Sequence, residues 1–193
     1  MEYKTSFEYF IVYLPQITKD YIELEGGIKL WLDTTFNPAE HRIPKAKVVA
    51  TPKYYDTPVE VGDYIYFHHN IVKNEKFKLD DHHFAVPANP NDPLVYAYEK
   101  DGEIGMLYDY MFVAPEESDD SGHGNLIIKR QRRVGDTIQV GRVRYANATS
   151  LAKFRGNVSD KIHFRKGRNA KFNVNGELLF RVKGVDVNFV YNE

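Results

Sequence analysis

Two groups of residues in this 193-residue chain combine histidine with carboxylates or with a second histidine: His68-His69 and Asp80-Asp81-His82-His83. Histidine and carboxylate are common zinc ligands, so both groups raise the question of a metal centre. Adjacent residues of a strand point to opposite faces, so each His-His pair would offer at most one ligand per side. The sequence therefore favours solvated strand ends over a metal site, and we predict no metal.

A third group brings the residue types of a nucleophilic triad together in one short stretch. Ser121-Gly122-His123-Gly124 directly follows Asp119-Asp120. A working triad is assembled by the fold from separate parts of a chain, so this stretch is interpreted as a flexible acidic loop. The chain also has no Cys and no phosphate-binding GxxxxGK[ST] sequence. We predict that the protein is not an enzyme and that it takes no cofactor.

A fourth group is basic, Lys129-Arg130-Gln131-Arg132-Arg133, and could hold nucleic acid. The formal net charge of the chain is −1, which gives no overall attraction to nucleic acid or to an anionic membrane. The favoured interpretation is that the basic run steers its loop toward an acidic partner surface. The sequence has neither an N-terminal secretion signal nor an 18-residue apolar run, which predicts a cytoplasmic protein with no membrane association.

The elements that must position these residues are predicted to be strands. Aromatic residues make up 14% of the chain, which suits pleated sheets, and no window of ten or more residues has helical periodicity with caps at both ends. An all-β fold is predicted, with strands at 7–14, 46–51, 63–69, 82–87, 94–99, 110–115, 138–145, 160–166, 178–182 and 187–191.

One further stretch, EGGIKLWL at 25–32, has the pattern of a short strand inside a polar loop. Two glycines allow backbone conformations that other residues rarely adopt, and Ile28, Leu30 and Leu32 then alternate with Lys29 and Trp31. One interpretation is an apolar hook that contacts a partner outside the molecule. The alternative is an ordinary core strand.

The two halves of the chain match one another in five places in the same order, which predicts a tandem duplication. The boundary falls in the turn region 100–105, so the predicted domains are 1–104 and 105–193. The matched segments are 10–15 with 110–115, 25–30 with 123–128, 61–67 with 158–164, 76–86 with 171–182, and 91–98 with 185–192.

Each half resembles the GroES-type co-chaperonin (chaperonin-10) family, in which a Gly-Gly-Ile-Val-Leu hook is followed by a Val-Gly-Asp-Ile-Val-Ile-Phe strand. The hook matches GGIKL at 26–30 and GNLII at 124–128, and the strand matches VGDYIYF at 61–67 and VSDKIHF at 158–164. The resemblance implies two tandem GroES-like β-barrels, each with a long mobile loop. The roof segment of the family would be reduced here, because the connecting stretches 50–58 and 147–157 are short.

The resemblance also implies a function: a co-chaperonin lid that oligomerises into a ring and caps a GroEL-type chaperonin, whose chamber holds the unfolded substrate protein. The residues implied to bind the chaperonin are Gly27, Ile28, Leu30, Leu126, Ile127 and Ile128. The second hook is expected to be the stronger, because Lys29 interrupts the first. Chaperonin rings of this type have seven subunits, an odd number that chains with two barrels cannot fill barrel by barrel. The alternative function is a structural or assembly ring component, such as a bacteriophage virion protein, that reuses the barrel.

Overall fold

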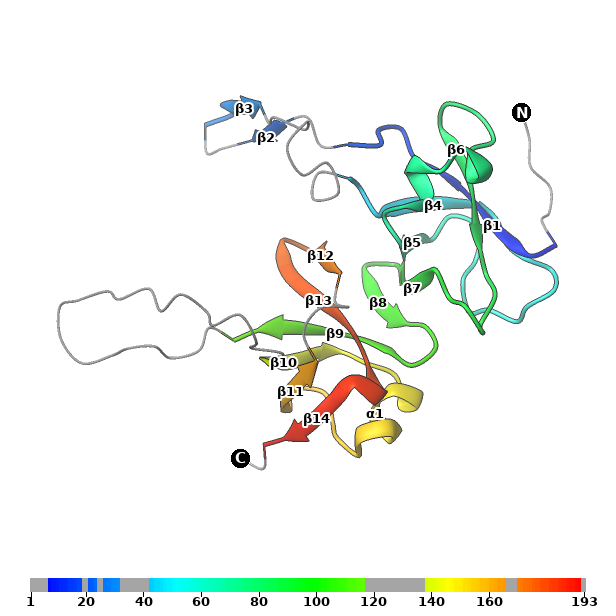
Figure 1. Ribbon diagram of the computed structural model, residues 1–193. Helices are drawn as coiled ribbons and strands as arrows, with labels where there is room; N and C mark the ends of the chain where they lie inside the picture. Colours follow the sequence, from blue (N-terminus) through cyan, green and yellow to red (C-terminus); the bar gives the residue numbers. More distant parts are fainter. Residues whose placement is uncertain are drawn as a thin grey trace. The chain divides into compact units, whose positions relative to one another are not determined.

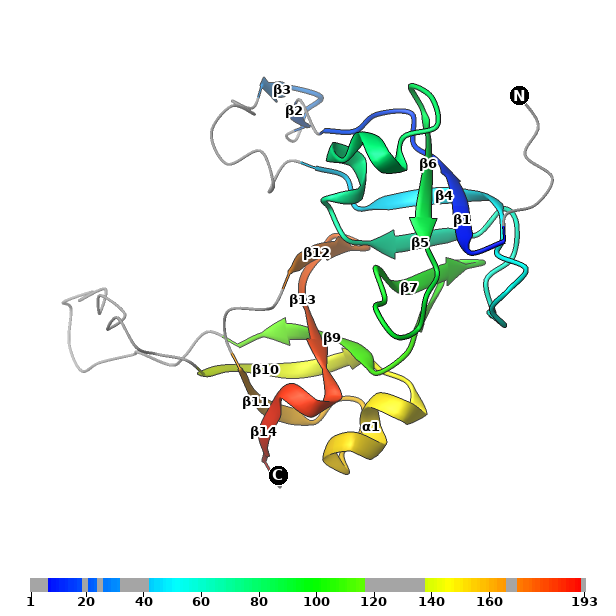
Figure 2. The same ribbon diagram turned by 45° about the vertical axis from the view of Figure 1, so that its right-hand side comes forward.

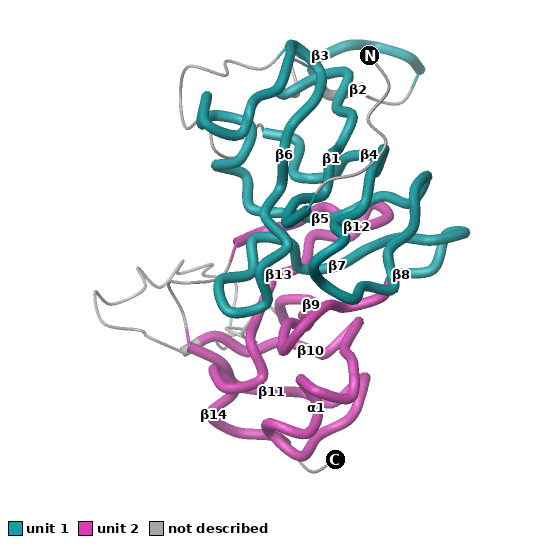
Figure 3. The backbone as a smooth tube through the Cα atoms, turned by 90° about the vertical axis from the view of Figure 1, so that its right-hand side faces the viewer, with its two compact units in different colours: residues 1–104 teal, residues 105–193 magenta. Residues whose placement is uncertain are grey.

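The computed structural model describes residues 7–18, 21–23, 26–31, 42–116, 138–165 and 170–191. The chain divides into two compact units, Met1–Ile104 and Gly105–Glu193, coloured separately in Figure 3. Each unit is built on a six-stranded antiparallel sheet, so the predicted all-β class is confirmed. No helix in the described part of the chain has the length and apolar character needed to cross a membrane.

The sheet of the first unit has the order β6-β1-β4-β5-β7-β8, and its edge strand β8 crosses the boundary at Ile104 (Figure 1). Figure 2 shows β6, β1, β4, β5 and β7 from another side. Strands β4 and β6 alternate as half-buried strands do: in β4, Ala46, Val48 and Ala50 are buried while the residues between them are less so. Two 3₁₀ turns, η1 (Ile71–Lys73) and η2 (Glu75–Phe77), lead from β5 to β6. The strand bounds are β1 Tyr9–Tyr13, β4 Lys45–Ala50, β5 Tyr64–Phe67, β6 His83–Pro87, β7 Val95–Lys100 and β8 Glu103–Met106.

The sheet of the second unit has the order β12-β13-β9-β10-β11-β14. A short helix, α1 (Ala148–Phe154), lies between β10 and β11, and the 3₁₀ turn η3 (Gly184–Asp186) lies between β13 and β14. The strand bounds are β9 Tyr110–Pro115, β10 Ile138–Tyr145, β11 Lys161–Arg165, β12 Lys171–Val174, β13 Glu177–Lys183 and β14 Val187–Val190.

Five strands of each sheet follow one plan: β6-β1-β4-β5-β7 in the first unit corresponds to β13-β9-β10-β11-β14 in the second. The β-bulges also correspond. Ile11 pairs with Ala50 and Val12 with Val48, which leaves out Val49. In the same way Phe112 pairs with Tyr145 and Val113 with Val143, which leaves out Arg144. The matching bulges therefore determine which residue of one sheet corresponds to which residue of the other.

The cores of the two units use equivalent positions. The core cluster of the second unit has seven buried members, and strand pairing gives each of them a buried counterpart in the first unit. Six pairs are identical in residue type and the seventh is Phe10 with Met111. The identical pairs are Val12 with Val113, Val48 with Val143, Ile65 with Ile162, Phe67 with Phe164, Phe84 with Phe180, and Val86 with Val182.

The turn before β5 and the turn before β11 are held by the same hydrogen bonds. The backbone N–H of Gly62 donates to the carbonyl of Val48 over 2.9 Å, and that of Ser159 donates to Val143 over 2.9 Å. The Asp63 carboxylate accepts from the backbone N–H of Glu60 at 2.8 Å, and the Asp160 carboxylate accepts from that of Asn157 at 2.7 Å. The sequence match of 61–67 with 158–164 is therefore in register.

Two other sequence matches are shifted along their strands. The match of 10–15 with 110–115 aligns Val12 with Phe112, whereas strand pairing makes Val113 the counterpart. The match of 91–98 with 185–192 aligns Val95 with Phe189, whereas pairing with β5 and β11 makes Val187 the counterpart. The connections between the strands differ in length, so an alignment of short sequence patterns can be wrong by one or two residues. The hydrogen-bonded pairing of the strands gives the correct correspondence.

All ten predicted strands are present, but the prediction missed the strands β2, β8 and β12 and the helix α1. Helix α1 has only seven residues, about two turns, which is too short to show a helical period, and it is specified by its caps. The side chain of Asn147 accepts from the backbone N–H of Ser150, and Arg155 ends the helix in a left-handed conformation. The stretch 147–157 therefore holds a helix, whereas 51–58 carries no helix or strand of its own.

Candidate functional site

Residues 26–31 of the EGGIKLWL stretch, the part that the structure describes, belong to a two-stranded hairpin made by β2 (Tyr21–Glu23) and β3 (Lys29–Trp31). The antiparallel pairs are Tyr21 with Trp31, Ile22 with Leu30, and Glu23 with Lys29. Gly26 and Gly27 precede β3 with φ of +84° and +77°, a conformation that side chains other than glycine rarely adopt. Of the predicted binding residues, Gly27, Ile28 and Leu30 are thus brought together here.

Ile28 and Leu30 are exposed on this hairpin, with 64% and 52% of their surface accessible. A core strand would bury such side chains, so the alternative of an ordinary core strand is wrong for these two residues. A protein surface that offers two large aliphatic side chains on a short hairpin has the chemistry to enter an apolar groove of another molecule.

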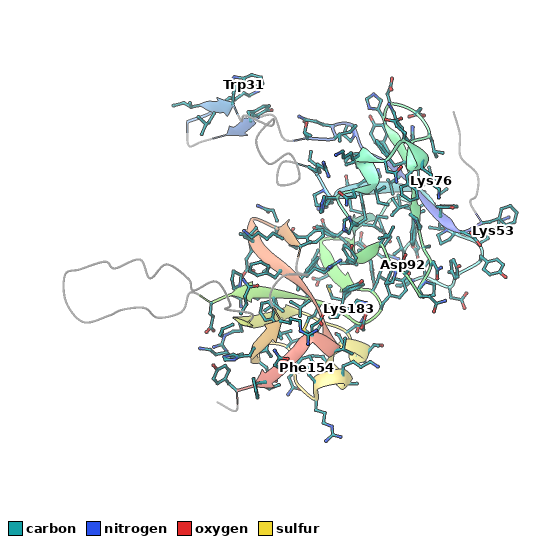
Figure 4. The ribbon with its side chains drawn as sticks, in the orientation of Figure 1. Trp31, Lys53, Lys76, Asp92, Phe154 and Lys183 are labelled. Atoms are coloured by element: carbon teal, nitrogen blue, oxygen red, sulfur yellow. The ribbon has the colours of Figure 1, made fainter. Side chains whose placement is uncertain are left out.

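The other side of the hairpin carries an aromatic and cationic cluster. The Lys29 Nζ lies 4.3 Å from the centroid of the Tyr21 ring, and the Trp31 ring meets the Tyr21 ring edge-on at 5.6 Å. Trp31 is 71% exposed and is labelled in Figure 4. Because side chains alternate along a strand, Lys29 and Trp31 face away from Leu30. Sequence reasoning missed Tyr21, whose only signal was its position across the Gly-Gly turn from Trp31.

The hairpin belongs to the segment 18–42, whose first and last residues lie next to each other. Thr18 and Arg42 form an isolated antiparallel bridge, and the N–H of Ile43 donates to the carbonyl of Ile17 over 3.0 Å. The Arg42 guanidinium also donates to the Asn70 side chain at 3.0 Å, next to η1. These contacts fix where the segment leaves the first sheet and where it returns.

The second predicted hook, Leu126, Ile127 and Ile128, lies outside the described residues, as do 119–124 and the basic run 129–133. The structure does describe what flanks 117–137. Glu116 follows β9, and its N–H donates to the carbonyl of Val140 over 3.1 Å. Its carboxylate pairs with Lys161 at 2.6 Å and with Arg142 at 3.2 Å. The hydrogen bond from Lys161 lowers the pKa of Glu116, so the carboxylate stays charged and joins β9, β10 and β11.

The histidine groups form local contacts at turns. His83 Nδ1 lies 2.9 Å from both carboxylate oxygens of Asp80, and the backbone N–H groups of His82 and His83 donate to Asp80. The hydrogen bond from the His82 backbone is the largest cause of the strongly lowered pKa of Asp80. His68 and His69 follow β5, and their rings stack at 4.5 Å.

The stacked rings lie together, so the argument that adjacent histidines point to opposite faces is wrong for His68 and His69, which lie beyond the strand end. Among the residues that the structure describes, no three histidine, cysteine or carboxylate residues are grouped as metal ligands would be. Asp80 has its own function in the turn, where it accepts hydrogen bonds from two backbone groups.

Comparison with known proteins adds no relative: no protein-family model matches the chain, and no curated protein sequence matches it. The likeness to GroES-type co-chaperonins therefore depends on the motifs of the sequence itself.

Proposed function

We propose that the chain is a co-chaperonin lid, a tandem duplication of a GroES-like β-barrel that oligomerises and caps a GroEL-type chaperonin ring while a substrate protein folds inside. The observation that carries the proposal is the exposure of Ile28 and Leu30 on a hairpin that lies between Thr18 and Arg42, two residues joined by an antiparallel bridge. Gly27 supplies the turn, and Leu126, Ile127 and Ile128 supply the second hook.

The common plan of the two units supports the duplication. Five strands in the same order, bulges at the same place and six identical core pairs would follow from one ancestral unit copied in tandem. The hook and the Val-Gly-Asp turn occur in the first unit in the order that the family has. The turn at Ser159-Asp160 repeats the hydrogen bonds of the turn at Gly62-Asp63.

The binding free energy of a single hook is small, as expected for a lid that must also dissociate from the chaperonin. Burying Ile28 and Leu30 would contribute about 1.5–3 kcal/mol each. Fixing the backbone of a loop costs roughly 1–2 kcal/mol per residue ordered, so a single hook binds weakly. Several hooks on one ring act together, because each contact raises the effective concentration of the next. Tight closure then depends on the ring, and release follows when the partner changes shape.

The test is ATP-dependent binding of the full chain to a purified GroEL-type ring, measured by co-sedimentation. We expect binding by the unaltered chain and its loss in two double variants, Ile28→Asp with Leu30→Asp, and Leu126→Asp with Ile128→Asp. The matched control is Leu79→Asp, which places the same charge at another exposed leucine of the first unit (46% accessible). Undiminished binding by both double variants would contradict the proposal.

The mass of the free assembly separates the lid from the alternative. Seven chains per particle, with binding to the chaperonin, favour the lid. Another number of chains, together with no binding to the chaperonin, favours a structural or assembly ring component.

A further inference from the structure

The Tyr21 ring holds the two strands of the hairpin together from one side. Tyr21 lies in β2, and both of its partners lie in β3: Trp31 is its direct cross-strand neighbour and Lys29 its diagonal one. An ammonium group over an aromatic face and an edge-to-face aromatic pair are both attractive. The three side chains therefore connect the strands in addition to the backbone pairing.

Such a connection matters because a short hairpin has little stability of its own. Two strands with three residue pairs are marginal in water without further support. Ile28 and Leu30 are largely exposed, so they bury little apolar surface within the hairpin. The Tyr21–Lys29–Trp31 cluster is thus a described feature of the hairpin that favours the paired state before any partner binds.

We propose that this cluster preorganises the hairpin, which binds as a preformed two-stranded ribbon with Ile28 and Leu30 in an apolar groove and with Trp31 turned away from it. The identity of the partner rests on the proposed function. Lys29 then stabilises the binding conformation, whereas the sequence predicted that it weakens the hook. A preformed element has less conformational entropy to lose on binding.

The inference also defines the partner surface. Neighbouring strands are about 4.8 Å apart, so a ribbon of two strands needs a groove wider by about that distance than a slot for a single strand. The floor of the groove must be apolar to accept Ile28 and Leu30, and the groove must stay open on the side of Lys29 and Trp31.

The first experiment examines the free full-length chain by NMR. Trp31 is the only tryptophan, so its indole signal is assigned at once. We expect nuclear Overhauser contacts between the Tyr21 and Trp31 rings and upfield-shifted methylene protons of Lys29, which lies over the Tyr21 ring. Random-coil shifts for Lys29 and no contact between the two rings would overturn the inference, whatever the partner.

The second experiment measures affinity for the chaperonin ring. Tyr21→Ala should weaken binding about fivefold to tenfold and Lys29→Ala about threefold, while Lys29→Arg, which keeps the cation, should bind as the unaltered chain does. The matched control is Lys53→Ala, an exposed lysine of the first unit (Figure 4). Tyr21→Ala with full affinity would overturn preorganisation. Absence of binding by the unaltered chain would instead overturn the proposed function, while the NMR contacts still decide whether the hairpin is preformed.

Discussion

Glu99 connects three strands of the first sheet through one carboxylate. Its Oε2 atom lies 2.7 Å from Lys45 Nζ and accepts a hydrogen bond from the Tyr66 hydroxyl at 2.9 Å, which joins β7 to β4 and β5. Only 17% of the Glu99 side chain is exposed. Burial alone would raise the pKa of Glu99, but the hydrogen bonds from Lys45 and Tyr66 outweigh it, and the pKa lies below its ordinary value of 4.5.

This network predicts a pH-dependent loss of stability in the Glu99→Gln variant. A lowered pKa means that the carboxylate stabilises the fold above about pH 4.5, and that this contribution is lost as the pH falls through the folded-state pKa. At pH 7 the variant should lose about 1 kcal/mol of unfolding free energy, because the pair is partly exposed. At pH 3 the difference should shrink. Urea unfolding at both pH values checks this, with the exposed Glu103→Gln as control. An equal difference at both pH values would contradict it.

Lys29 illustrates how much of the site a sequence can predict. The alternation of residues 28–31 was sufficient to predict that Ile28 and Leu30 share a side and that Lys29 points away. The contact of Lys29 with Tyr21 was not predictable, because it depends on the register of two strands joined by a Gly-Gly turn. A shift of one residue in that register would place Tyr21 on the other side.

At the scale of elements, the turns before β5 and β11 place a residue with positive φ at the same position. Gly62 has φ of +105°, and Ser159 has φ of +78°. A Cβ at Gly62 would meet no atom within 4 Å, so only the backbone conformation opposes a side chain there. Glycine adopts this conformation at no steric cost, whereas serine does so with strain.

Exchanging these two residues should change stability in opposite directions. Gly62→Ser should destabilise the protein by about 1–2 kcal/mol, the cost of a left-handed conformation in a residue with a Cβ. Ser159→Gly should stabilise it by about 0.5 kcal/mol, because relief of strain exceeds the added entropy of the unfolded chain. Thermal and urea unfolding of both variants check the signs. A change in the same direction for both would mean that the two turns are not equivalent.

The helix α1 marks the limit of prediction for elements. Most strands were predicted because alternation over several residues is a local signal, whereas a helix of seven residues shows too few turns to reveal a period. Its start depends on Asn147, whose side-chain amide also donates to the carbonyls of Met106 and Tyr108 at 3.0 and 2.8 Å. Those partners lie about forty residues away, and no local pattern reveals such a contact.

At the scale of the whole molecule, each unit has a core of its own. The cluster of Met111, Val113, Val143 and their neighbours contains residues of the second unit alone. The equivalent residues of the first unit are buried in its own sheet. Comparison of the two halves of the sequence predicted that they correspond. The pairing of the strands corrects two of the sequence matches, one by one residue and the other by two residues. The connections between the strands differ in length, so equivalent residues of the two units are identified only from the hydrogen-bonded pairing of the strands.

Separate cores predict that a core change in one unit leaves the other unit unaffected. Ile65 and Ile162 occupy equivalent, fully buried positions, so Ile65→Val and Ile162→Val should each cost about 1 kcal/mol. Native-state hydrogen exchange should then accelerate about fivefold in the most protected amides of the altered sheet alone. The double variant should show both effects with no coupling, since independent sites add. Accelerated exchange in both sheets from either single change would mean that the two units unfold as one.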